Sequence, residues 1–333
     1  MPGAEVPTRV DRSAGSQARP ACAVRWTHAL AWAAAGATFP LIWMGGLVTT
    51  YGAGMAVPDW PSTFGYNLFL YPLESWLAVW DVFLEHSHRL LGASVGLLSI
   101  ALAVALWLTD RRRGMKWLGL AALAGVVLQG VLGGLRVLGN EIFLAKVHGC
   151  TGPAFFALAA ALVTLTSPAW PAHGGPAGST PGFRRAAWLL AAAIYTQIVL
   201  GANLRHQDPE GGAGWFRLWV WLHVIVAGVV VAATVAMRVW ASSRVGQPVV
   251  VRRAGLLVGL LVLQVCLGIA AWVVRYGIPA WFADWTGELP YTVQAQSPLQ
   301  AIVVTAHVAV GSLALATAVT LCLWSGRAGT QHN

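Results

Sequence analysis

Four of the nine histidines are regularly placed along the chain. His88, His148, His223 and His307 each stand near the beginning of a long apolar segment. Ionisable residues inside apolar spans are rare and usually functional. Imidazole binds zinc, copper, iron and nickel, but a closed zinc site needs about four ligands, usually with cysteine or carboxylate among them. Two histidines that face each other across a helix bundle suit axial ligation of haem iron, so these residues predict two haem sites.

A carboxylate accompanies only one of the two predicted pairs. Glu85 precedes His88 by three residues, which places both on one helical face if the helix begins early enough. The matching position before His223 is Val220. An enzyme with one reacting haem and one electron-supplying haem needs such an asymmetry, whereas a carboxylate that caps a helix N-terminus is the alternative. Glu85 is therefore the candidate catalytic residue.

Basic residues near the same ends of the spans are candidate partners for haem propionates. A guanidinium binds a carboxylate through two parallel hydrogen bonds, although snorkelling to the membrane interface explains each residue equally well. The candidates are Arg89, Arg136, Arg205, Arg217 and Arg275. The other histidines receive no role and are expected at ordinary surface or interface positions: His28, His86, His173, His206 and His332.

Membrane-spanning helices must position these residues. Of the 333 residues, 57% are hydrophobic and 10% are charged, against roughly 25% charged in a soluble domain. The mean hydropathy is +0.64. Backbone polar groups cannot be left bare in lipid, which predicts helices. Eight stretches approach the length of a span: 26–48, 88–109, 116–136, 144–166, 185–204, 217–240, 253–274 and 301–324.

The distribution of charge predicts the orientation of these helices. The net charge is +9, but the basic residues gather in the N-terminal tail and in the second, fourth and sixth connections. The positive-inside rule accounts for that placement, so nucleic acid is not expected as a partner. Both termini are predicted to be cytoplasmic, in a multi-pass protein surrounded by the lipid of a bacterial inner membrane.

The two halves of the chain resemble each other. The segment 129–134 (QGVLGG) matches 264–269 (QVCLGI) at an offset of 135 residues. His88 and His223 are separated by the same offset of 135 residues. A parallel repeat of four helices follows, since both halves begin on the same side. The expected organisation is a disordered cytoplasmic tail 1–25, a four-helix bundle 26–166, a linker 167–184, a second four-helix bundle 185–324 and a cytoplasmic tail 325–333.

The chain resembles the haem A synthase family, membrane enzymes that assist cytochrome oxidase assembly. The resemblance spans nearly the whole chain and implies two tandem, pseudo-symmetric four-helix bundles. Its motifs are GGLVTTYGAGMAVPDWP at 45–61, EHSHRLLG at 85–92, QGVLGG at 129–134, VHG at 147–149, QIVLGANLRH at 197–206 and HVAVG at 307–311. Many members carry cysteine pairs in the outer loops. Val57 and Thr63 stand at the flanking positions here, so the chain resembles a branch without those cysteines.

The resemblance also implies a reaction and a division of roles. His88 and His148 would ligate substrate haem O in the first bundle, and the other two histidines a resident haem b in the second. A ring methyl of haem O would be oxidised to the formyl of haem A by successive hydroxylations, the gem-diol then losing water. Glu85 would stabilise positive charge near that methyl or handle protons. Haem O synthase is an implied partner, while the electron donor (quinol is one candidate) and a homo-oligomeric state are left open.

Two other classes of function share these features. A di-haem electron carrier, or a haem-binding assembly factor without oxygenase activity, would contain the same histidine pairs. A carrier that moves electrons across the membrane stacks its haems toward opposite faces, whereas all four histidines are predicted on one side. Glu85 also has no obvious use in a pure carrier. A transporter needs a polar pathway, and the cytoplasmic halves of the predicted spans contain almost no polar residues.

Overall fold

The computed structural model describes residues 21–172, 179–206, 212–279, 284 and 292–327. Within these ranges the regular structure is helical, without β-strands, and eight helices are long and apolar enough to cross a membrane, as predicted. These helices are α1 (Ala21–Tyr51), α3 (Trp80–Thr109), α4 (Arg113–Gly139), α5 (Ile142–Thr166), α7 (Pro181–Arg205), α8 (Gly212–Trp240), α9 (Pro248–Tyr276) and α11 (Pro298–Arg327).

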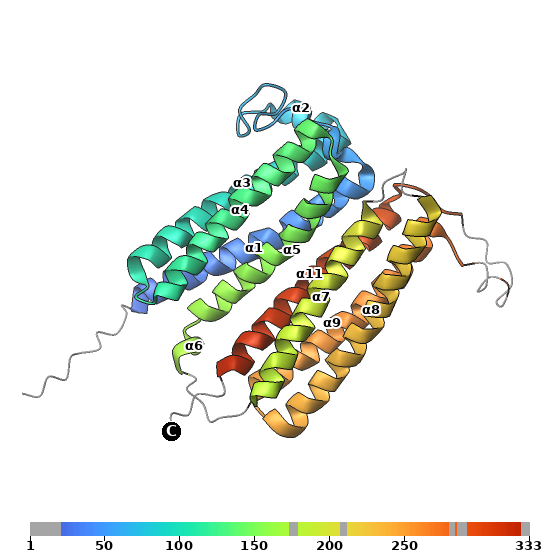
Figure 1. The fold of residues 1–333 in the computed structure, drawn as a ribbon. Coiled ribbons are helices and arrows are strands. Elements are labelled where there is room, and N and C mark those ends of the chain that lie inside the picture. Colours follow the sequence, from blue (N-terminus) through green and yellow to red (C-terminus); the bar gives the residue numbers. More distant parts are fainter. Residues whose placement is uncertain (1–20, 173–178, 207–211, 280–283, 285–291, 328–333) are drawn as a thin grey trace, which may run out of the picture.

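The spanning helices pack in two groups of four, which lie side by side (Figure 1). In the first bundle, α1 and α4 each pack against α3 and α5. In the second bundle, α8 and α11 each pack against α7 and α9. The bundles meet where α11 contacts α1 and α5, and where α5 contacts α7. The predicted all-α fold is therefore confirmed, and the assignment of a different role to each half stays a prediction.

Short elements mark the two ends of the molecule. The 3-10 helix η1 (Ala53–Met55) and α2 (Leu73–Ala78) lie at one end, called here the α2 end, and α6 (Ala169–Ala172) lies at the opposite α6 end (Figure 1). Five residues of π-helix, Ala241–Val245, continue α8. The start of α1 and the end of α11 both lie at the α6 end. Because the number of spanning helices is even, the first and the last must end on the same side of the molecule. The side of the membrane that each end of the molecule faces stays a prediction.

Several helices extend beyond the apolar stretches that predicted them. α3 begins at Trp80 rather than 88, and α8 begins at Gly212 rather than 217. Polar and aromatic residues in these first turns lower the hydropathy without interrupting the backbone hydrogen bonds, so hydropathy alone underestimates helix length. The four histidines consequently lie between six and eleven residues inside their helices, not at the helix starts as expected.

The ends of the chain were predicted as tails. α1 begins at Ala21, inside the predicted tail 1–25, and α11 continues to Arg327, inside the predicted tail 325–333. Residues 1–20 and 328–333 lie outside the described residues, as do His173 and His332.

Large apolar side chains fill the α6-end half of both bundles. In the first bundle Leu102, Leu106 and Leu162 are at most 2% exposed, and in the second Phe183 and Leu257 are completely buried. These residues belong to the apolar core of their bundles. Burial of such side chains is the main favourable term that holds packed helices together outside lipid, and close packing holds them within it. The core thus joins the helices at the α6 end and leaves the other half free to contain a site.

The two bundles are in close contact at Gly46 of α1. A Cβ atom at this position would lie 2.6 Å from Cγ2 of Thr305 on α11, closer than real Cβ contacts. Arg205 of α7 donates to the carbonyl oxygen of Gly46 at 2.6 Å and to Oγ1 of Thr50 at 3.0 Å. Gly46 therefore allows one helix of the first bundle to meet two helices of the second.

Substitution of Gly46 tests this junction. We expect Gly46→Ala to lower the free energy of unfolding by about 1–3 kcal/mol, because the added methyl overpacks the contact with Thr305. Thermal unfolding of the purified chain in detergent measures the change. Gly36→Ala on the same helix is the matched control, since its Cβ would meet nothing within 4 Å. An equal effect of both substitutions would contradict the close contact at Gly46.

Candidate functional site

The structure brings the four predicted histidines together in two pairs. The ring centres of His88 on α3 and His148 on α5 are 6.3 Å apart, with an interplanar angle of 81°. Those of His223 on α8 and His307 on α11 are 6.4 Å apart, at 61°. Each pair therefore joins two helices of one bundle and presents two imidazoles to the same small volume.

The spacing of the rings fits two axial ligands of one metal ion. A metal–imidazole bond is about 2 Å long and a ring nitrogen lies about 1.1 Å from the ring centre, so opposed imidazoles have centres about 6.2 Å apart. Among the described residues, no three histidine, cysteine or acidic side chains converge on a metal position. Haem iron needs only two ligands from the protein, because the porphyrin supplies four nitrogens. The pairs thus fit haem iron and do not form a zinc-type site.

Both histidine pairs line one large cavity in the α2-end half of the molecule. Its volume is about 1880 Å³, and helices of both bundles form its wall. Ordinary ligand pockets reach about 1,000 Å³, so this cavity has room for two bulky ligands. The lining also contains all five arginines that the sequence singled out as propionate partners: Arg89, Arg136, Arg205, Arg217 and Arg275.

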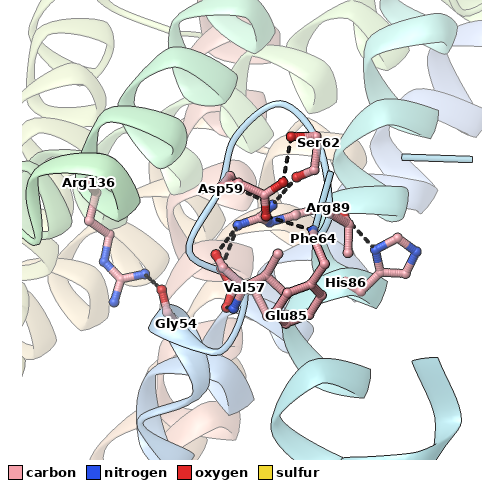
Figure 2. Close-up of polar contacts among 10 residues, drawn as sticks. Gly54, Val57, Asp59, Ser62, Phe64, Glu85, His86, Arg89 and Arg136 are labelled. Atoms are coloured by element: carbon pink, nitrogen blue, oxygen red, sulfur yellow. Dashed lines mark hydrogen bonds and ion pairs between the residues drawn. The ribbon is translucent and has the colours of Figure 1, made fainter. Parts of the chain in front are cut away.

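Glu85 lies buried in the wall of this cavity, beside the first histidine pair. The residue is 3% exposed. Its Oε2 accepts a hydrogen bond from the backbone N–H of Val57 at 2.9 Å, and its Oε1 accepts one from Arg89 Nη2 at 2.9 Å (Figure 2). Both carboxylate oxygens are therefore held, which fixes the orientation of the group. Val220, the matching residue of the second half, also lines the cavity, so the predicted asymmetry exists in the structure.

Arg89 fastens the loop that follows η1 to α3. Its Nη1 donates to the carbonyl oxygens of Asp59 at 2.7 Å and Ser62 at 2.9 Å, and its Nη2 donates to that of Val57 at 2.8 Å (Figure 2). The loop also packs Trp60 against Gly134 of α4, where any side chain would collide with the indole. Arg89 therefore anchors this loop over the cavity. This role differs from the two that the sequence suggested, which were pairing with a haem propionate and snorkelling to the membrane interface.

Asp59 organises the tip of the same loop. Its carboxylate accepts hydrogen bonds from the backbone N–H groups of Phe64 at 2.8 Å and Gly65 at 2.9 Å, and from Ser62 Oγ at 2.5 Å. Burial raises the pKa of this carboxyl group, but the hydrogen bonds outweigh burial and lower the pKa to about 2. Asp59 therefore remains a charged acceptor at neutral pH and keeps the loop in one shape.

Two residues that flank the Pro58–Pro61 segment connect this loop to the site. Val57 and Thr63 are both completely buried. Val57 binds Glu85 through its backbone, and Thr63 Oγ1 lies 3.1 Å from Nδ1 of His86. The loop is thus connected to α3 by hydrogen bonds. The cysteines whose side chains are described form no disulfide, and they are Cys150, Cys266 and Cys322.

Two histidines that were expected at ordinary positions are part of this region. His86 is 1% exposed, because α3 begins early enough to include it, and its ring packs between Tyr71 and Trp76. His206, just after α7, lines the cavity. Burial, followed by the positive charges of Arg205 and Arg136, lowers the pKa of His206 to about 4. His206 is therefore neutral at pH 7.

Three further arginines of the lining lie in different surroundings. Arg136 donates to the carbonyl oxygen of Gly54 at 3.4 Å (Figure 2). Arg275 lies over the ring of Tyr276, with 5.7 Å between the guanidinium carbon and the ring centre. Arg217 is exposed at the cavity rim. These groups place positive charge around an apolar cavity, which suits ligands that carry carboxylates.

Sequence reasoning missed the part played by three glutamines. Gln129 Nε2 donates to the backbone carbonyl of His148 at 3.3 Å, and Gln197 Nε2 donates to that of His223 at 2.9 Å. Gln264 Nε2 lies 3.3 Å from Nε2 of His307. The repeated Gln-x-x-Leu-Gly pattern was visible in the sequence, but its contact with the histidines depends on which helices are neighbours.

The fold and the site define a multi-pass all-α membrane protein with two buried histidine pairs suited to haem. The chain belongs to the COX15-CtaA family of cytochrome oxidase assembly proteins, whose profile matches residues 28–210. Its similarity to individual proteins is more distant, at 26–28% identity.

Three relatives carry the name haem A synthase. The protein of Alkalihalophilus pseudofirmus is 27% identical over 177 residues, which are 52% of this chain and 58% of the relative. That of an Exiguobacterium species is 26% identical over 251 residues, 70% and 78% of the two chains. That of Shouchella clausii is 28% identical over 184 residues, 52% and 57%. The match thus spans less than two thirds of the first and third of these relatives.

The low pKa of His206 leads to a prediction about pH. The unfolded chain binds a proton at this residue near pH 6.5, whereas the folded chain binds it only near pH 4. The unfolded state therefore gains the proton first, and the folded state loses stability as the pH falls from about 6.5 to 4. We expect His206→Asn to flatten this part of the profile of thermal stability against pH. An unchanged slope between these values would contradict the burial of a neutral His206.

Proposed function

We propose that this chain is a haem A synthase, which oxidises a ring methyl of haem O to the formyl group of haem A and so supports cytochrome oxidase assembly. Membership of the family and the name shared by the three relatives support the proposal. The observation that carries it is the position of Glu85, a buried and oriented carboxylate beside one histidine pair, where Val220 stands at the matching position of the other half.

The asymmetry supports a division of roles between the bundles. His88 and His148 would hold haem O as substrate, because Glu85 lies in the cavity wall on that side. His223 and His307 would hold a resident haem b, which supplies one-electron redox chemistry when bound. Both pairs line the same cavity.

Residues of the chain would bind the substrate, exclude water and stabilise charge. The loop fastened by Arg89 brings Trp60 and Pro61 into the cavity lining, which shields the α2 end from solvent. Glu85, fixed by Val57 and Arg89, would stabilise positive charge at the reacting methyl or accept a proton from it. Because its orientation is set before the substrate arrives, the group needs no rearrangement during the reaction.

The proposal extends to the surroundings of the protein. Eight apolar helices and the basic connections support a place in the bacterial inner membrane, with both termini in the cytoplasm. Haem O would come from a haem O synthase in the same membrane, and a donor such as quinol would supply electrons. A homo-oligomer is compatible with this scheme, and nucleic acid has no part in it.

An electron carrier or a haem-binding assembly factor is the second candidate function. The shared cavity favours it, because two haems side by side could exchange electrons without any chemistry on their rings. Glu85 distinguishes the two candidates, since a carrier has no use for a buried carboxylate beside only one haem.

Replacement of Glu85 by glutamine tests the proposed role. Glutamine keeps the size of the side chain and can still accept the hydrogen bond from Val57, but it removes the charge. We expect haem binding to persist while haem A output falls by about 100-fold or more, the usual contribution of acid–base catalysis. The assay extracts haem after co-expression with a haem O source in a host without haem A of its own, and separates it by chromatography and mass analysis.

Glu74→Gln is the matched control. Glu74 is an exposed carboxylate on α2, so the same chemical change outside the cavity should leave haem A output unaltered. Normal haem A output from Glu85→Gln would remove Glu85 from the mechanism. Loss of bound haem together with product would show that Glu85 holds the site together and does not act on the substrate.

A further inference from the structure

Each of the four paired histidines faces a glycine on a neighbouring helix. A Cβ atom added at any of these glycines would lie within 2.9–3.3 Å of Cε1 of the facing ring, which is tighter than most real Cβ contacts. An imidazole ring is rigid and cannot yield as the end of a flexible side chain can. The facing pairs are Gly45 and His88, Gly133 and His148, Gly201 and His223, and Gly268 and His307.

The backbone four residues before each glycine lies beside the same ring. Nδ1 of His307 is 3.2 Å from the carbonyl oxygen of Gln264. The backbone groups at the other three positions lie near their histidines, Leu41 near His88, Gln129 near His148, and Gln197 near His223. The Nδ1 atoms of these three rings are buried and form no hydrogen bond with the described residues, so the contact is complete at His307 alone.

Helix geometry explains why glycine is needed at these positions. The Cα–Cβ bond of a helical residue points toward the N-terminus, so its side chain covers the turn that precedes it. A side chain four residues after a carbonyl group would therefore cover that carbonyl. With glycine there, an imidazole from another helix can approach the backbone oxygen, as His307 does with Gln264.

We propose that Gly45, Gly133, Gly201 and Gly268 are positioning residues that set the ring orientation and the tautomer of the four histidine ligands. The inference rests on the proposed binding of haem. A hydrogen bond from Nδ1–H to a backbone carbonyl fixes a ligating imidazole and makes it more basic. A glycine that faces a histidine ring recurs on α1, α4, α7 and α9, once for each of the four histidines.

Other glycines of the cavity wall show that this arrangement is not a general property of the lining. Gly92, Gly96, Gly130 and Gly228 also line the cavity, but a Cβ at any of them would meet nothing within 4 Å. Packing of small residues between helices therefore does not account for the four glycines that face histidines. Matched controls are Gly36 and Gly259, which lie outside the cavity lining and have nothing within 4 Å of an added Cβ. Gly→Ala adds the same methyl and the same helix propensity at each place.

The test compares Gly201→Ala with Gly259→Ala in the full chain, purified with its bound haem. Both substitutions add a methyl to a helix of the second bundle, but only the first meets the ring of His223, and Gly259 lies outside the cavity lining. The electron paramagnetic resonance spectrum of ferric low-spin haem depends on the orientation of its axial imidazoles. We expect the largest g value of one haem to shift in Gly201→Ala and to stay unchanged in Gly259→Ala.

The first bundle provides a second comparison. Gly45→Ala places a methyl 2.9 Å from His88, and Gly133→Ala places one 3.3 Å from His148. We expect Gly45→Ala to disturb the spectrum of the first haem more than Gly133→Ala does. Gly36→Ala, on the same helix as Gly45 but outside the cavity lining, should leave the spectrum as in the unmodified chain. If Gly45→Ala does not fold, the roomier Gly133 and Gly201 positions still decide the question.

The outcomes separate this inference from the proposed function. An unmodified chain without bis-histidine low-spin haem contradicts the proposed function before any variant is compared. Where that signal is present, identical spectra of Gly201→Ala and Gly259→Ala overturn the positioning role and leave the proposed function intact. A shift confined to the substitutions that face histidines supports it.

Discussion

The structure depends on the close approach of imidazole rings to bare helix backbone. Each ring reaches its position only because the facing residue is glycine, and each pair keeps its ring centres 6.3 or 6.4 Å apart. Helices that are kept apart around the histidines must pack closely elsewhere along their length. The apolar core supplies these contacts at the α6 end, and the loop anchored by Arg89 closes the opposite end.

The two sites are joined through adjacent residues of α1. Gly45 faces the ring of His88, and Gly46 faces Thr305, two residues before His307 on α11. Arg205 of the second bundle binds the carbonyl oxygen of Gly46 as well. A displacement of α1 would therefore affect both histidine pairs, which favours a fixed distance between the two proposed haems. Glu85 makes the two sites chemically different, because the second half has Val220 at the matching position.

Much of the fold and part of the site followed from the sequence, since hydropathy and the spacing of the histidines are encoded locally. The spans, the partners within each histidine pair and the distinct position of Glu85 are of this kind. The loop contacts of Arg89, the burial of His86 and the glycines that face the histidines depend on neighbours far away in the chain. Hydropathy also placed the helix starts too late, because aromatic and charged residues in the first turns are helical without being apolar.

The haem that the unmodified chain contains tests the two proposed sites most directly. The chain would be produced with a haem O source in a host that lacks haem A, and its haem would be extracted and identified by mass. We expect haem A together with haem b, one product and one resident group for the two histidine pairs. Haem b with unconverted haem O, in a chain that binds both and is supplied with reductant and oxygen, would contradict the proposed oxidation of haem O.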